Sequence, residues 1–250
     1  MGLRCKRCGS EEHVKNGFMK GLQRYRCKAC GLNFTDTPPR GMPLRVKVTA
    51  VLLYLSGLSM NRTAKLLGVS TPSVMTWIEQ FAKAYAQKPE PEGRAVVVEL
   101  DEMWHFLKKK ANKLWVWKAR DRATGRIIDW ELGGRDRATL ERLLERLKRW
   151  GVRLYCTDDW AAYVEAIPQG RHYVGKEETH GIERDHSRQR HWLARFRRRT
   201  CVVSRAERMV DASIALFVRF GDSVGVNELK RWGQRTHVYA SLRPCPFLPQ

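Results

Sequence analysis

The sequence has few acidic residues and no long apolar run, and each absence excludes a class of protein. Only 26 Asp and Glu residues stand against 47 Lys and Arg residues, which gives a formal net charge of +21. No run of 18 apolar residues is present to span a bilayer, and the first ten residues lack a signal peptide's apolar core. We therefore expect a cytoplasmic protein without a membrane partner, whose positive charge suits a polyanion such as nucleic acid.

Cysteine is scarce outside the first thirty residues, where four of the seven cysteines lie. They form two Cys-x-x-Cys pairs at the spacing of a tetrahedral zinc site, each followed by a glycine suited to a tight turn. A reducing compartment argues against disulfides, and Asn16-Gly17 predicts a hairpin turn between the pairs. We predict a zinc ribbon over 1–36, whose basic residues favour phosphate contact over a purely structural role. The predicted zinc ligands are Cys5, Cys8, Cys27 and Cys30.

A segment with helical periodicity follows a Pro/Gly-rich linker, and we predict a helix-turn-helix DNA-binding domain over 44–88. Gly68 supplies the turn, and Thr71 followed by Pro72 predicts the start of the last helix. One face of that helix is apolar, with Val74, Trp77, Ile78 and Phe81. The opposite face offers polar groups suited to base edges, namely Ser70, Ser73, Thr76 and Gln80. A helical hairpin that only packs or dimerises is the alternative.

The second half of the chain predicts an α/β domain over 94–222. Its expected strands lie at 95–100, 113–119, 126–132, 152–156 and 171–175. Expected helices follow the third, fourth and fifth strands, the longer ones at 181–198 and 205–220. This order matches a ribonuclease H-like fold with a mixed five-stranded sheet, in which the first and fourth strands are parallel neighbours. The whole chain is therefore predicted to be multi-domain, with an all-α domain between the ribbon and the α/β domain.

Acidic residues follow the first and fourth of these strands. Parallel pairing would bring Asp101 and Asp158 together at the carboxyl edge of the sheet, where ligands collect. Close carboxylates repel, and a divalent cation such as Mg²⁺ relieves the repulsion. Glu183, near the start of a helix, is the third candidate. Helix capping or a solvated ion pair would explain each acid separately, and Glu102 and Asp159 compete for the same roles.

Arginines crowd the helix that carries Glu183 and the segment after it. A solvated face is the simplest interpretation, but beside three acids we interpret the cluster as gripping the DNA strand that is cut. It comprises Arg184, Arg188, Arg190, Arg195, Arg197, Arg198 and Arg199. Trp104 and Trp160 flank the first two acids, where stacking on an unpaired base and core packing both stay open.

In their order, these motifs resemble those of bacterial insertion sequence 1 family transposases. The resemblance covers about residues 1–220 and rests on the ribbon, the helix-turn-helix, "LDEMW", "TDDW" and "IER". It implies the family's DDE triad, which falls on Asp101, Asp158 and Glu183. The sequence departs from the family pattern where Asp159 replaces a Gly and His186 replaces an Asn, and the tail 223–250 has no recognisable counterpart.

The resemblance implies a DNA transposase that binds element ends and performs strand cleavage and strand transfer on double-stranded DNA. Two Mg²⁺ or Mn²⁺ ions about 3.5–4 Å apart would serve this chemistry, and a homo-oligomer of at least two chains would handle two ends. Other functions stay open from sequence alone. They are a zinc-ribbon and helix-turn-helix regulator, a ribonuclease H-like nuclease without strand transfer, and an inactive transposase retained for DNA binding.

Overall fold

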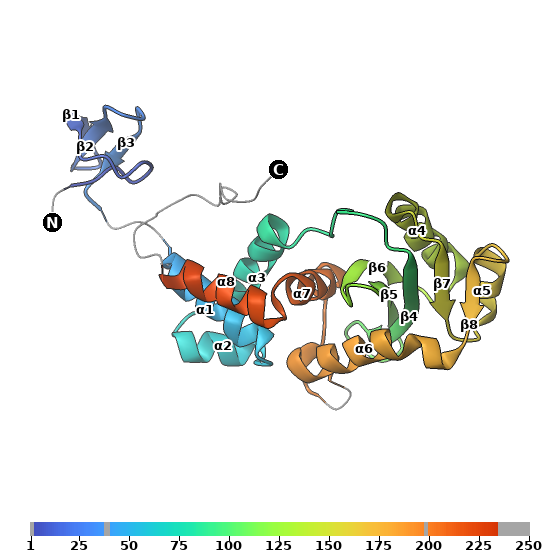
Figure 1. Cartoon of the computed structure of the whole chain (residues 1–250). Helices are drawn as coiled ribbons and strands as arrows, with labels where there is room; N and C mark the ends of the chain where they lie inside the picture. The colour runs from blue at the N-terminus through green and yellow to red at the C-terminus, as the bar shows by residue number, and fades with distance from the viewer. Residues whose placement is uncertain (1–2, 38–40, 198–199, 235–250) are drawn as a thin grey trace. The chain divides into compact units, whose positions relative to one another are not determined.

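The computed structural model describes residues 3–37, 41–197 and 200–234 (Figure 1). By contacts the chain divides into two units, Met1–Thr49 with Asn227–Gln250 and, separately, Ala50–Val226. Helices α1 (Leu44–Leu55) and α8 (Ser223–Gln234) each run across a boundary between these units. No helix within the described residues combines the length and apolarity that crossing a bilayer requires.

The N-terminal segment is a three-stranded antiparallel sheet of β1 (His13–Met19), β2 (Leu22–Cys27) and β3 (Asn33–Thr35). The hairpin turn predicted at Asn16-Gly17 is wrong. The chain reverses at Lys20 and Gly21, whose φ values are 51° and 77°. Gly17, with φ 71°, instead lies inside β1, where the register shifts. Its left-handed conformation accommodates a bulge rather than the turn.

Two further helices follow α1, namely α2 (Met60–Leu67) and α3 (Thr71–Tyr85). The turn between them forms as predicted, because Gly68 ends α2 with φ 64°. The predicted cap is wrong by one residue, since the Ser70 side chain accepts the Ser73 N–H and Thr71 is the first helical residue. The predicted apolar stripe of α3 is confirmed as buried.

The larger unit is built on a mixed five-stranded sheet in the order β6-β5-β4-β7-β8. As predicted, the first and fourth strands of this domain, β4 and β7, are parallel neighbours, and β8 pairs in parallel with β7. The remaining pairs are antiparallel. The strands are β4 (Val97–Phe106), β5 (Lys113–Asp121), β6 (Ile127–Gly133), β7 (Leu154–Thr157) and β8 (His172–Val174).

Strand β4 is longer than its apolar run predicts. Its ladder with β5 continues to the pair Phe106 and Lys113, which places Asp101 in the middle of the strand rather than at its end. The extension persists because Met103 and His105 remain buried beyond Asp101, so the strand still has an interior face there. Strand β7, by contrast, stops at Thr157, as expected for an acid placed at a strand end.

Helices cover both faces of this sheet (Figure 1). One face packs against α4 (Arg137–Leu147) and α5 (Ala161–Ala166) around a buried apolar cluster. On the other, α6 (His180–Trp192) contacts β4 and β5, while α7 (Glu207–Phe220) contacts α3 and β6. The helix predicted at 181–198 is shorter in the structure. It ends at Trp192, and a separate 3₁₀ turn follows at Ala194–Phe196. The predicted tail also begins with a helix, α8.

Candidate functional site

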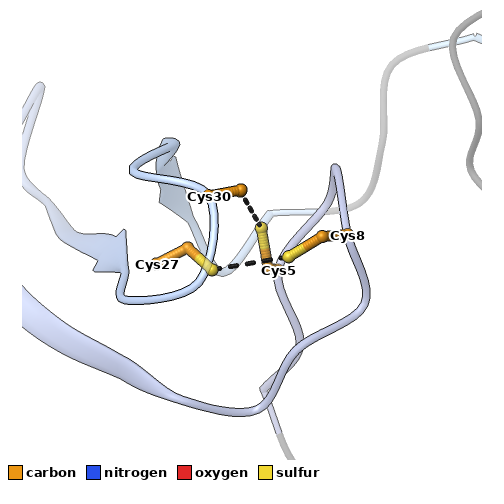
Figure 2. Close-up of side chains that lie close together, drawn as sticks. All are labelled: Cys5, Cys8, Cys27 and Cys30. Atoms are coloured by element: carbon orange, nitrogen blue, oxygen red, sulfur yellow. Dashed lines mark hydrogen bonds between the residues drawn. The ribbon is translucent and has the colours of Figure 1, made fainter.

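Four cysteine side chains converge at one end of the N-terminal sheet (Figure 2). Their sulfurs all lie within 4.8 Å of one another, with Cys5 Sγ 3.5 Å from Cys30 Sγ and Cys8 Sγ 3.5 Å from Cys27 Sγ. Each pair is followed by a glycine with positive φ, as the sequence predicted. Tyr25, Phe34 and Leu32 pack around the buried thiols, so the cluster forms one compact site of sulfur donors.

The thiols of this cluster affect each other's ionisation. Burial opposes thiolate formation at Cys5, but N–H donors of Cys8 and Arg7 outweigh it and lower the Cys5 pKa to about 6. At exposed Cys8 the backbone N–H of Ser10 lowers the pKa, yet partial desolvation and the neighbouring sulfurs raise it to about 12. Ionisation of one thiol therefore opposes ionisation of its neighbour, and a shared cation would relieve this repulsion.

In the larger unit, the structure brings two of the three predicted acids together. Val97, Val98 and Glu99 pair with Leu154, Tyr155 and Cys156. Continuing this parallel register by two residues places Asp101 opposite Asp158, on the same face of the sheet. The pKa of Asp158 is raised, first by burial and then by the Asp101 charge. These two carboxylates therefore repel each other at the point where β7 ends.

The environment of Asp158 favours a cation. Its Oδ1 is buried and has no hydrogen-bond partner in the part of the chain that the structure describes. An oxygen acceptor in such a position carries a desolvation cost unless a donor or cation meets it. Both carboxylate oxygens of Asp101, by contrast, have polar partners. Its Oδ1 accepts the Glu102 N–H at 2.8 Å, and its Oδ2 lies 3.2 Å from His186 Nδ1.

The third predicted acid, Glu183, does not join this pair in a compact ligand group. It lies exposed in the first turn of α6. Among the described residues, only the four cysteines form a group of three or more His, Cys, Asp or Glu ligand atoms within 4.8 Å of one another. The inward stripe predicted for this helix is nevertheless confirmed, since Ile182, His186 and Gln189 are buried. Glu183 therefore lies beside the buried stripe, one turn before His186.

Two buried ion pairs that the sequence analysis missed fix α6 on the sheet. Glu99 accepts the Ile182 N–H at 2.7 Å and pairs with Arg120 at 2.9 Å. Lys118, opposite Asp101 on β5, is fully buried and lies 2.8 Å from Asp185. The sequence contained a signal for both ion pairs, because Glu99 and Lys118 are charged residues inside otherwise apolar strands. Burial lowers the pKa of Lys118, and the Asp185 charge opposes that shift.

His186 is the residue of this helix whose side chain contacts Asp101. Burial and the Lys118 charge lower its pKa to about 4, although Asp101 opposes the shift. The imidazole is therefore neutral at neutral pH, and its Nδ1–H can donate to Asp101. Its Nε2 is buried without a partner among the described residues. His186 thus orients Asp101 without adding a charge.

Glu102 and Asp159, the alternative candidates for the acid pair, have different surroundings. Glu102 points to the opposite face of β4, where it accepts hydrogen bonds from Tyr163 at 2.9 Å and from Arg135 at 2.6 Å. Burial raises its pKa, which these two donors oppose. Asp159 is exposed beside Asp158. Trp160 packs against Trp117 and Tyr163, whereas Trp104 stays 39% exposed.

The predicted DNA-contacting residues fall into different environments. Ser70, the cap of α3, is exposed, as are Thr76 and Gln80 on the helix. Ser73 is half-buried, with its hydroxyl 2.9 Å from that of Ser70. Among the arginines, Arg184, Arg188 and Arg197 are exposed and Arg190 is half-buried, while Arg198 and Arg199 lie outside the described residues.

Arg195 does not fit the predicted role in DNA contact. Its side chain is buried, with Nε donating to the Tyr54 hydroxyl at 2.7 Å and Nη1 to Ser204 at 3.4 Å. The guanidinium also lies over the Tyr54 ring. Its donors bind protein groups inside the unit, so we exclude Arg195 from the DNA-contacting set.

Comparison with known proteins identifies related sequences. A family model described as IS1 transposase matches residues 95–221. The chain is similar to the insertion element iso-IS1n protein InsB of Shigella dysenteriae, with 32% identity over 50% of this chain and 95% of that protein. It is 32% identical to the IS1 protein InsB of Shigella flexneri, over 49% of this chain and 94% of that one. A solved pre-cleavage Mos1 transpososome overlaps 81% of each chain at 12% identity, and its TM-score of 0.35 is too low to bear on the fold.

Proposed function

This chain belongs to the IS1 transposase family and is a DDE-type DNA transposase, and we propose that Asp101, Asp158 and Glu183 are its catalytic acids. The observation that carries the proposal is the parallel register of β4 and β7, which directs Asp101 and Asp158 to the same edge of the sheet. Their mutual repulsion and the unpartnered Asp158 Oδ1 are the conditions that a divalent cation relieves. Glu183, on the turn of α6 that Glu99 anchors, is the acid proposed to complete the set.

The proposed cofactor is Mg²⁺ or Mn²⁺, which the oxygen donors suit, and a bound ion would polarise the phosphate and lower the pKa of an attacking water. The proposed reaction has two displacements at phosphorus. Water oxygen first bonds to the phosphorus at the element's end as the P–O3′ bond breaks, which frees a 3′-hydroxyl. That hydroxyl then bonds to a target phosphorus as the target's own P–O3′ bond breaks. His186 keeps Asp101 oriented through both displacements.

The N-terminal parts are proposed to recognise DNA. Residues 1–36 would form a zinc ribbon whose four sulfur donors suit Zn²⁺, and 44–88 a helix-turn-helix that presents Ser70, Thr76 and Gln80 to base edges. The ribonuclease H-like domain would span 94–222. Exposed arginines of α6 would hold the cleaved strand. The partner is double-stranded DNA in a bacterial cytoplasm, bound by at least two copies of the chain.

Matched substitutions at two adjacent aspartates test the catalytic assignment. Asp158→Asn removes the charge of a proposed ligand, whereas Asp159→Asn removes an exposed charge one residue away. With Mg²⁺ and a duplex that carries one element end, we expect Asp158→Asn to slow nicking by at least about 100-fold, because even residues that only support a metal ligand matter 10- to 100-fold. Asp159→Asn should stay within a few-fold of wild type.

The products of the same assay separate the remaining functions. Joining of the nicked end to a second duplex supports a transposase, and nicking without joining supports a nuclease. Binding without any nicking supports a regulator or an inactive copy. Equal nicking by Asp158→Asn and wild type would reject the proposed site.

A further inference from the structure

An arginine that contacts the residue after Asp101 lies close to two indole rings. Arg135 lies in the segment between β6 and α4, and its guanidinium carbon is 5.0 Å from the ring centroid of Trp115 and 5.0 Å from that of Trp160. Trp115 comes from β5, and Trp160 directly follows the Asp158–Asp159 pair. The guanidinium is therefore clamped between a strand and the segment that carries a proposed catalytic acid, with little rotational freedom left to lose on binding.

Only part of this guanidinium is used by the protein. Nε and Nη2 both approach Glu102 Oε1 at 2.6 Å, while Glu102 Oε2 accepts the Tyr163 hydroxyl at 2.9 Å. Nη1 has no hydrogen-bond partner within the described stretches of the chain. The side chain remains 40% exposed. One edge of the fork is thus fixed on a buried carboxylate, and the other edge has donors available to solvent or to a ligand.

The position of Arg135 points to a ligand on the DNA strand. Arg135 contacts Glu102, which directly follows Asp101 on the other face of β4, and Trp160, which lies two residues after Asp158. A fixed guanidinium with free donors suits a phosphate oxygen. The ion pair of Arg135 with Glu102 has no net charge and would attract phosphate less than a lone arginine. Its contacts with Glu102 and the two tryptophans nevertheless fix the orientation of the guanidinium. Such a contact would place the strand in register rather than simply raise affinity.

We propose that Arg135 binds a non-bridging oxygen of a phosphate that flanks the scissile phosphate on the cleaved strand. Glu102, Trp115 and Trp160 position the guanidinium for this contact. The inference rests on the proposed function, because it takes Asp101 and Asp158 as the site of cleavage. It names a substrate contact that lies outside the acidic triad and outside the arginines of α6.

Neutral phosphate analogues test this contact directly. A series of element-end duplexes would carry one methylphosphonate each, at successive positions on both sides of the cleavage point. For wild type we expect one flanking position to slow nicking by roughly 10- to 100-fold, the range for a lost hydrogen bond between charged groups. Arg135→Gln should be slower by a similar factor on unmodified DNA, and methylphosphonate at that position should then cost it nothing further.

Two other variants complete the design. Arg135→Lys keeps the charge without the fork, so it should retain part of the sensitivity to methylphosphonate at the same position. Arg137→Gln changes an exposed arginine that is paired with Glu141, and it should reproduce the wild-type profile. If Arg135→Gln does not fold, as judged by tryptophan fluorescence, the Arg135→Lys profile decides by the same comparison.

The outcomes separate this inference from the catalytic assignment. If every methylphosphonate costs the Arg135 variants as much as it costs wild type, the phosphate contact is overturned and Arg135 only ties β4, β5 and the segment after β7 together. If instead Asp158→Asn cleaves normally, the proposed acids are wrong, whatever the methylphosphonate profile shows.

Discussion

The cysteine cluster and the acid pair are both candidate metal sites, but they are assembled in different ways. The four cysteines lie within one short segment and already converge, with all sulfurs within 4.8 Å. The three acids come from β4, the segment after β7, and α6. Only Asp101 and Asp158 meet, while Glu183 stays exposed.

The difference shows what holds each site in place. Around the cysteines the apolar cluster is small, with Cys5, Cys27 and Phe34 as its buried members, so a bound metal must supply much of the folding energy. Around the acids a large core and buried ion pairs hold the frame. We therefore expect metal to be required for folding at the first site and for chemistry at the second.

Chelation is expected to give the largest difference between the two sites. Removing metal should unfold the N-terminal segment, because zinc binding to such peptides contributes on the order of 10–16 kcal/mol. All nine tryptophans lie from Trp77 onward, so their fluorescence should not change, while backbone amide signals of the ribbon collapse in an NMR spectrum.

Substitution of single cysteines sharpens the same test. Cys8→Ser should abolish stoichiometric zinc binding, whereas Cys201→Ser, at an exposed cysteine outside the cluster, should leave it intact. A ribbon spectrum that persists after complete chelation would contradict the zinc assignment.

The next largest effect is expected at the buried ion pair of the larger unit. Lys118→Met leaves Asp185 without its cation and should destabilise this unit by about 3–5 kcal/mol, the usual cost of breaking a buried pair. Urea unfolding followed by tryptophan fluorescence measures it. Combining Lys118→Met with Asp185→Leu should recover most of the loss, because the unpaired charge is gone. Equal destabilisation of the single and double variants would show that packing, not charge pairing, matters here.

A smaller effect is expected from a buried histidine. Burial and then the Arg195 charge lower the His105 pKa to about 4 from 6.5. The unfolded chain binds this proton first as pH falls, so the stabilisation is present above pH 6.5 and is lost toward pH 4. The loss should reach about 2 kcal/mol at pH 4.5.

His105→Asn removes this titration. The difference in unfolding free energy between wild type and variant should therefore shrink by that amount between pH 7 and 4.5, and other groups cancel in the subtraction. A difference that does not change with pH would mean that folding leaves the pKa of His105 unshifted.

Much of the fold follows from local patterns, and the errors occurred where tertiary contacts override them. The strand order and the stripes of α3 and α6 were predicted, because period and burial coincide there. The extent of β4 was not predicted, because pairing with β5 continues the strand past Asp101. Arg195 was misassigned for a similar reason. No local pattern shows that Tyr54, far away in the sequence, accepts its hydrogen bond.

The sequence by itself determined the cysteine cluster, the order of the elements and the identity of the candidate acids, because ligand spacing and hydrophobic periodicity are local properties. Only the tertiary structure decided that Glu183 stays exposed, that Lys118 and Asp185 form a buried pair, and that Arg135 contacts two tryptophans. These contacts join residues far apart in the chain. They depend on strand register and helix packing, which no short stretch of sequence encodes.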